Sequence, residues 1–152
     1  MAKILIVDDE ADMRTVLFHT LRTAGHKVTE AESGEEALRK LKRTKFDLVL
    51  LDIMMPRMSG YEVLEKIKQM PSRVDTRVVV VTAKHDPEGI QREVASGATD
   101  HIAKPFLPSE LLAVIKRALK GPKRAVEERR GELRRSAEVY GALGELRRDL
   151  DD

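Results

Sequence analysis

The sequence predicts an α/β domain over residues 1–121, with a parallel sheet covered by helices on both faces. Two observations support this fold class: short apolar runs recur along the chain, and segments with helical spacing of apolar residues separate them. Strands that alternate with helices form parallel sheets with right-handed crossovers, which place helices on both faces. The expected strands are residues 3–7, 27–31, 47–51, 78–81 and 100–103, and the expected helices are 11–24, 34–43, 60–70, 87–96 and 109–120.

The first half of the domain contains clear signals for where its helices begin and end. The strand at residues 3–7 is closed by the acidic residues 8–10. Helical spacing of apolar residues then continues up to Gly25, a residue type that commonly follows the last turn of a helix. Ser33 and Glu36 form a capping box, with a hydroxyl at the cap and a carboxylate three residues later. We therefore expect a helix to start directly after Ser33.

The second half repeats this pattern. The strand at 47–51 contains four consecutive apolar residues, which is typical of a strand buried on both faces. A second capping box begins at Ser59, and the valine run at 78–81 has strong strand preference. Asp86 followed by proline starts the next helix, and Gly121 followed by proline ends the last one. The order of elements predicts a doubly wound five-stranded parallel sheet of the flavodoxin-like (βα)5 type.

Composition narrows the possible functions. The 152 residues are 41% hydrophobic and 36% charged, which is typical of a globular protein. No apolar run is long enough to cross a membrane, the N-terminal sequence does not resemble a signal peptide, and there is no cysteine. The net charge of +2 and the aromatic content of 3% give no support for direct nucleic-acid binding. We expect a cytoplasmic protein with no membrane partner.

Polar residues follow or end most of the expected strands. Asp8 and Asp9 follow the first strand, Asp52 follows the third, Thr82 ends the fourth and Lys104 follows the fifth. Because the carboxyl ends of parallel strands meet at one edge of a sheet, these residues are expected to gather there. A single aspartate after a strand would commonly just start a turn. The complete set favours a functional site.

The chemistry of this set points to a metal ion and a phosphoryl group. Three neighbouring carboxylates repel one another, and a hard divalent cation such as Mg²⁺ (or Mn²⁺) relieves that repulsion. No glycine-rich phosphate loop is present, so binding of a whole nucleotide is not expected. Asp52 can act as a carboxylate nucleophile, and Lys104 and Thr82 can hold phosphoryl oxygens.

The chain resembles the receiver domain of two-component response regulators. The resemblance covers residues 2–120, and its segments occur in the order and at the spacing typical of the family. Each segment alone is a weak signal, whereas the set is specific. The matching segments are Val7–Glu10, Leu50–Pro56, Ser59–Gly60, Val81–Ala83, Gly97–Ala98 and Lys104–Phe106.

The resemblance implies a role for each residue of the set. Asp52 would accept a phosphoryl group from a sensor histidine kinase or phosphotransfer protein. Asp9 and Asp52 would bind Mg²⁺ directly, together with the backbone carbonyl of Met54, and Asp8 would act mainly through water. Lys104 would pair with the phosphoryl group. The chain would then be a signalling domain that assists its own phosphorylation, rather than an enzyme with a separate substrate.

The resemblance also implies a conformational switch. Thr82 would hydrogen-bond to the phosphoryl group, and the residue three before the lysine, here His101, would turn inward with it. The Lys104–Pro105 peptide bond would be cis. The output would be a change in contacts with a downstream protein, through the face of the fourth helix, fifth strand and fifth helix, which can also form a homodimer.

Two features depart from the commonest family pattern. His101 replaces the usual tyrosine or phenylalanine, either as a substitute ring or as a group that makes the switch sensitive to pH. Met54 and Lys84 lie two residues beyond Asp52 and Thr82, where they would border the path of the hydrolytic water. We expect them to alter the lifetime of the phosphoryl group.

Residues 122–152 lie outside the resemblance and are expected to form a helical tail or linker. The segment is too short for an independent core. It is interpreted as a frayed extension, a pairing helix, or the start of a linker to an output domain. In the last case the chain would be the regulatory half of a larger regulator.

An aspartyl-nucleophile phosphatase is a weaker alternative because Met54 stands where such enzymes place a second acid. A flavin carrier is disfavoured by the missing phosphate loop.

Overall fold

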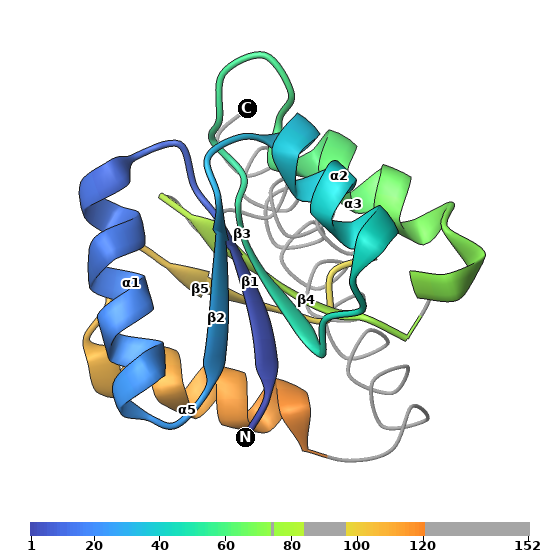
Figure 1. The fold of residues 1–152 in the computed structure, drawn as a ribbon. Coiled ribbons are helices and arrows are strands. Elements are labelled where there is room, and N and C mark those ends of the chain that lie inside the picture. Colours follow the sequence, from blue (N-terminus) through green and yellow to red (C-terminus); the bar gives the residue numbers. More distant parts are fainter. Residues whose placement is uncertain (74, 84–96, 121–152) are drawn as a thin grey trace, which may run out of the picture.

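The computed structural model describes residues 1–73, 75–83 and 97–120. They form one five-stranded sheet in the order β2-β1-β3-β4-β5, and all neighbouring strands are parallel (Figure 1). The strands are β1 (Lys3–Val7), β2 (Lys27–Ala31), β3 (Leu48–Asp52), β4 (Arg77–Thr82) and β5 (Asp100–Ala103). The helices are α1 (Ala11–Thr23), α2 (Gly34–Arg43), α3 (Gly60–Lys68), the short 3₁₀ helix η1 (Pro71–Arg73) and α5 (Pro108–Leu119).

The predicted doubly wound parallel fold is confirmed. Each described strand and α-helix begins and ends within about two residues of its expected bounds, the usual uncertainty of element ends, whereas η1 was not expected. Asp52 is the last residue of β3, which is shifted by one residue from the expected range of 47–51. The helix expected at 87–96 and the tail at 122–152 lie outside the described residues.

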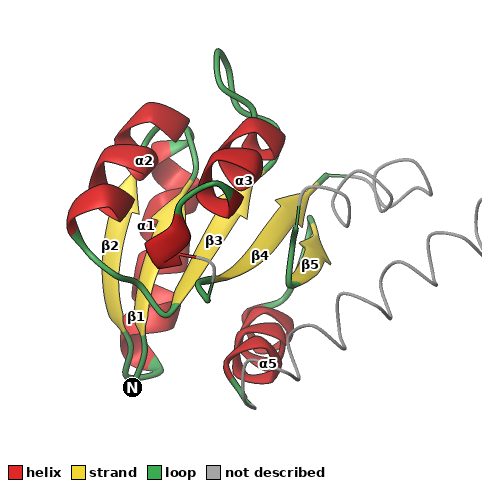
Figure 2. Ribbon diagram, turned by 90° about the vertical axis from the view of Figure 1, so that its right-hand side faces the viewer, coloured by secondary structure: helices red, strands yellow, loops and turns green. Residues whose placement is uncertain are grey.

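Helices cover both faces of the sheet, as Figures 1 and 2 show, with α1 and α5 on one face and α2 and α3 on the other. Alternation along β1 and β3 divides the core between these faces. Leu5 and Val49 pack in the cluster under α2 and α3, whereas Ile4 and Leu48 pack in the cluster under α1 and α5. The central strand β3 is buried at every position, while the edge strand β2 is mostly half-buried.

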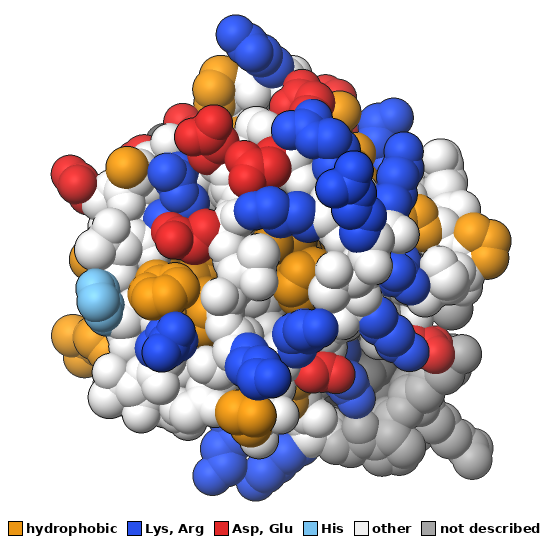
Figure 3. Space-filling model, viewed as in Figure 1, with side chains coloured by type: hydrophobic (Ala, Val, Ile, Leu, Met, Phe, Trp, Pro, Cys, Tyr) orange, Lys and Arg blue, Asp and Glu red, His pale blue; other side chains and the backbone are white. Residues whose placement is uncertain are grey.

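Local signals in the sequence set the starts of α2 and α3. The Ser33 hydroxyl accepts a hydrogen bond from the Glu36 N–H at 3.2 Å, and Ser59 accepts one from the Glu62 N–H at 3.4 Å. Both expected caps are therefore confirmed. Acidic residues occupy the first turns of these helices and basic residues the last turns, which complements the helix dipole. Figure 3 shows Lys and Arg side chains gathered over the part of the surface where α2 and α3 lie.

Among the described helices, none combines the length and the apolar character needed to cross a membrane.

Candidate functional site

The sheet order brings the polar strand ends together. Because β1, β3, β4 and β5 are consecutive neighbours in the sheet, Asp8, Asp52, Thr82 and Lys104 stand at the carboxyl ends of four adjacent strands. The register places Asp52 beside Val81, and Thr82 beside the end of β5. The gathering of these residues at one edge, expected from the sequence, is observed.

Three aspartates form the centre of this edge. One carboxylate oxygen from each of Asp8, Asp9 and Asp52 lies within 4.8 Å of the others. Asp8 and Asp52 are buried, and Asp9 is exposed to solvent. Three clustered carboxylates are the oxygen donors that Mg²⁺ and Mn²⁺ prefer, so the residues present fit a hard divalent cation. We call these three residues the acidic cluster.

Lys104 supplies the positive charge beside the acidic cluster. Its Nζ lies 3.4 Å from Asp8 Oδ2 and 3.6 Å from Asp52 Oδ2, so it bridges the two buried carboxylates. The backbone N–H of Lys104 donates to the Thr82 carbonyl at 2.6 Å, which ties the end of β5 to the end of β4. The Lys104–Pro105 peptide is cis, as the resemblance implies.

Local backbone contacts fix Asp52. The Met54 N–H donates to Asp52 Oδ1 at 3.0 Å, and the Ile53 N–H donates to the Val81 carbonyl at 3.2 Å. Gly60 approaches the same backbone so closely that a Cβ there would lie 2.5 Å from the Asp52 carbonyl oxygen. Met54 is 72% exposed and borders the site next to solvent.

The electrostatics of the site follow from this crowding. Burial and then repulsion from Asp8 raise the pKa of Asp52 from 3.8 to about 6, although Lys104 and the Met54 N–H act in the opposite direction. Burial lowers the pKa of Lys104, but attraction to Asp52 and Asp8 outweighs burial and leaves that pKa above its ordinary value. A buried carboxylate that resists ionisation beside other carboxylates would be relieved by a bound cation.

The two predicted switch residues occupy the expected strands. Thr82 is buried at the end of β4, next to the acidic edge. His101 is half-buried in β5, and its backbone N–H donates to Asp100 Oδ1 at 2.9 Å. Their motion on phosphorylation, and the metal-ligand role of the Met54 carbonyl, stay predictions. Lys84 lies outside the described residues.

Two features of the site region were missed by the sequence analysis. Arg14 on α1 donates from Nη1 to the backbone carbonyl of Asp8 at 2.7 Å. Asp100 is buried and pairs with Arg117 on α5, with Arg117 Nη2 at 2.7 Å from Asp100 Oδ2. Both arginines occur at helical positions without a nearby motif, so the only available signal was a basic residue on a helix that packs against the sheet.

Comparison with known proteins places these features in context. The sequence model of the response regulator receiver domain family matches residues 4–116. The phosphate regulon transcriptional regulatory protein PhoB of Pseudomonas aeruginosa is 39% identical over 117 residues, which cover 77% of this chain and 51% of PhoB. The chain therefore spans about half the length of such curated relatives.

Solved structures agree with this match. The Vibrio cholerae chemotaxis protein CheY4 is 38% identical with a TM-score of 0.76, and the alignment covers 78% of this chain and 99% of CheY4. The BeF3-activated DrrB receiver domain is 36% identical with a TM-score of 0.70, and the alignment covers 78% of this chain and 97% of that receiver domain.

Proposed function

Because the chain belongs to the response regulator receiver domain family, the signalling domains of two-component systems, we propose that it accepts a phosphoryl group on Asp52 from a histidine kinase or phosphotransfer protein. One observation carries this proposal: the acidic cluster and Lys104 lie together at the carboxyl edge of the sheet. The proposed domain comprises residues 1–121, with 122–152 as a tail or linker.

The proposed reaction is a single displacement at phosphorus. A carboxylate oxygen of Asp52 attacks the phosphorus of the donor phosphohistidine while the bond between phosphorus and the imidazole nitrogen breaks. The electron pair of that bond stays on the imidazole nitrogen, which takes a proton from solvent, and Asp52 becomes an acyl phosphate. Asp8, Asp9 and Asp52 would hold Mg²⁺, with the Met54 carbonyl as a further ligand, and the bound ion supplies neutralisation of phosphoryl charge.

Lys104 and Thr82 complete the proposed site. Lys104 Nζ already lies between Asp8 and Asp52, so it is placed to pair with a phosphoryl oxygen on Asp52. Thr82 ends the adjacent strand, where its hydroxyl would donate to the same group. We propose that the domain exchanges between two conformations, one of which has Thr82 and His101 turned inward. Contacts that form only when Asp52 is phosphorylated would favour this inward conformation and so shift the equilibrium towards it.

Exposed apolar side chains on the segments that follow the site residues support a protein partner. Val16 on α1 and Leu107 just before α5 are both exposed, although they are large hydrophobic residues. These elements directly follow Asp8, Asp9 and Lys104 in the chain. We propose that a histidine-bearing partner docks over them, while the downstream target or a second copy binds the face that includes β5 and α5.

A second candidate is that the chain is the regulatory half of a larger regulator. The half-length match to PhoB supports it, whereas the nearly complete match to CheY4 supports a stand-alone receiver. Sedimentation of the chain with and without acetyl phosphate and Mg²⁺ would show whether phosphorylation drives pairing of receivers.

The test of the main proposal is incubation with acetyl phosphate and Mg²⁺, followed by measurement of intact mass. We expect the mass to increase by one phosphoryl group, and the increase to disappear on addition of EDTA. Asp52→Asn should show no gain, while Asp47→Asn, which changes an exposed aspartate elsewhere, should behave as the unmodified chain. A gain that persists in Asp52→Asn would refute the assignment of the acceptor.

A further inference from the structure

We infer that Arg14 is a positioning residue that holds the β1–α1 turn in the geometry that binds a divalent cation. The inference rests on the proposed function, because it takes Asp8 and Asp9 as metal ligands. It concerns a residue that does not touch the metal or the phosphoryl group and that acts through the backbone of Asp8.

The first step concerns the end of β1. The ladder of β1 ends at Val7, which pairs with Ala31 in β2 and Leu51 in β3. The Asp8 N–H still donates to the Ala31 carbonyl at 3.2 Å, but the Asp8 carbonyl lies beyond the last strand pair. A buried carbonyl without a donor is destabilising. Arg14 Nη1 supplies that donor at 2.7 Å.

The second step concerns which atoms of Asp8 are used. Asp8 is 1% exposed, and each of its polar atoms has a different partner. Oδ1 accepts from the Glu10 N–H at 2.9 Å, and Oδ2 faces Lys104 Nζ at 3.4 Å. Because Arg14 binds the main chain, it brings positive charge close to the acidic cluster without occupying a carboxylate oxygen. Arg14 therefore does not compete with a metal ion for the carboxylate oxygens of Asp8.

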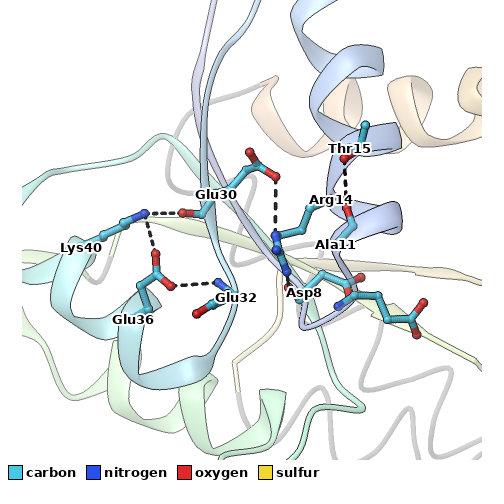
Figure 4. A network of polar contacts seen from close by, with 9 residues as sticks. Asp8, Ala11, Arg14, Thr15, Glu30, Glu32, Glu36 and Lys40 are labelled. Carbon is cyan, nitrogen blue, oxygen red and sulfur yellow. Dashed lines mark hydrogen bonds and ion pairs between the residues drawn. The ribbon is translucent and has the colours of Figure 1, made fainter.

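The third step concerns what holds Arg14 itself. Figure 4 shows that its guanidinium faces Glu30 on β2, and that Glu30 begins a chain of contacts to α2. The distance between Arg14 Nε and Glu30 Oε1 is 3.6 Å. The Glu30 carbonyl accepts from Lys40 Nζ, which also pairs with Glu36 at 2.8 Å. The Glu30 side chain is 41% exposed and the separation is long, so this ion pair contributes little by itself. The bond to the Asp8 carbonyl is the contact that matters.

The test is a Mg²⁺ titration of the full chain at pH 7 without a phosphoryl donor, followed by amide NMR shifts of residues 8–10. We expect Arg14→Ala to weaken Mg²⁺ binding by about tenfold, as loss of an outer support of a metal ligand typically does. Arg22→Ala is the matched control on the same helix, since the Arg22 guanidinium is exposed and lies on the Phe18 ring. It should change the affinity by less than about twofold, as should Glu30→Gln.

A metal-free measurement separates positioning from general destabilisation. In EDTA, hydrogen exchange of the Glu10 amide should speed up in Arg14→Ala, because that amide is bonded to the carboxylate that Arg14 steadies. Amides of β4 should exchange as in the unmodified chain. Arg14→Lys keeps the charge but offers no planar fork of donors, so it should recover part of the affinity. It also provides a second variant if Arg14→Ala does not fold.

The phosphorylation rate gives a third reading. With acetyl phosphate, Arg14→Ala should need more Mg²⁺ to reach half its maximal rate, while the maximal rate stays within about twofold. Unchanged Mg²⁺ affinity in Arg14→Ala, or an equal loss in Arg22→Ala, would overturn the inference while the proposed function stands. Absence of both Mg²⁺ binding and phosphorylation in the unmodified chain would overturn the proposed function as well.

Discussion

Leu51 and Asp52 are neighbours in β3 and are almost equally buried, at 0% and 4% exposed, yet they have opposite effects on stability. Leu51 lies in the apolar cluster under α2 and α3, where burial is favourable. Asp52 faces the other aspartates, where burial and repulsion raise its pKa to about 6. The interior of the sheet stabilises the fold, and the carboxyl edge keeps an unfavourable arrangement that a ligand can relieve. This is the stability–function trade-off expected of a site.

The largest effect on stability should come from the interior side of this comparison. Leu51→Ala removes a fully buried side chain and leaves a cavity, so the free energy of unfolding should fall by about 2–5 kcal/mol. Urea denaturation in EDTA measures this free energy. Its dependence on pH should have the same shape in Leu51→Ala as in the unmodified chain. A loss of under about 1 kcal/mol would show that the packing around Leu51 can collapse.

The edge should respond in the opposite direction. In the folded chain the pKa of Asp52 is about 6, against an ordinary value of 3.8, so its contribution to stability is present below pH 4 and is lost as pH rises through 6. Asp52→Asn should therefore stabilise the metal-free chain at pH 7 by about 3 kcal/mol, which corresponds to the shift in pKa.

Urea denaturation in EDTA between pH 4 and pH 8 checks this sign. The free energy of unfolding is measured against pH for the unmodified chain and for Asp52→Asn. The difference between the two curves gives the contribution of Asp52, and this difference should grow as the pH rises. Addition of Mg²⁺ at pH 7 should raise the stability of the unmodified chain more than that of Asp52→Asn. Parallel profiles would show that Asp52 ionises normally.

A smaller effect on stability is expected at Gly60, which contacts the backbone at the end of β3. In Gly60→Ala the new Cβ would lie 2.5 Å from the Asp52 carbonyl oxygen and 2.7 Å from Ile53 Cα, and neither backbone atom can move freely. We expect the free energy of unfolding to fall by about 1–3 kcal/mol. Phosphorylation should also be slower, because the backbone of Asp52 must shift.

Gly34→Ala is the matched control for this substitution. Its Cβ would meet side-chain atoms of Val63 and Met58 at 2.8–2.9 Å, and these can partly move away. It should leave the rate of phosphorylation by acetyl phosphate unchanged. An equal slowing in both variants would show that the contact with the Asp52 backbone has no special importance.

The smallest effect belongs to the helix caps. Ser33→Ala removes the acceptor of the Glu36 N–H and should destabilise the fold by about 1 kcal/mol, without a change in phosphorylation. Ser59→Ala should have a smaller effect because its capping bond is longer, at 3.4 Å. Thermal unfolding of both variants tests the order, and the reverse order would contradict it.

Sequence reasoning located the candidate site because its residues follow simple rules. Asp8, Asp52, Thr82 and Lys104 end or follow apolar runs, and a parallel sheet brings such ends to one edge. Capping at Ser33 and Ser59 was likewise predictable, since both partners lie within one turn of helix.

Contacts between distant elements were not predictable in this way. The bond from Arg14 to the Asp8 carbonyl depends on how α1 packs, and the pair of Asp100 with Arg117 depends on where α5 lies across β5. Arg57 adopts a φ of 66°, a conformation that favours glycine, and its side chain gives no sign of this. Propensity describes local choices, and these features come from tertiary packing.

The position of Lys104 in the chain has a consequence for synthesis. The aspartates occur within the first 52 residues, and the lysine that lies between two of them comes 52 residues later. At about 5–20 residues per second, a ribosome would synthesise Asp52, the last of these carboxylates, roughly 3–10 seconds before Lys104. A nascent chain thus contains all three aspartates before Lys104 exists, and β5 must dock before the edge is complete.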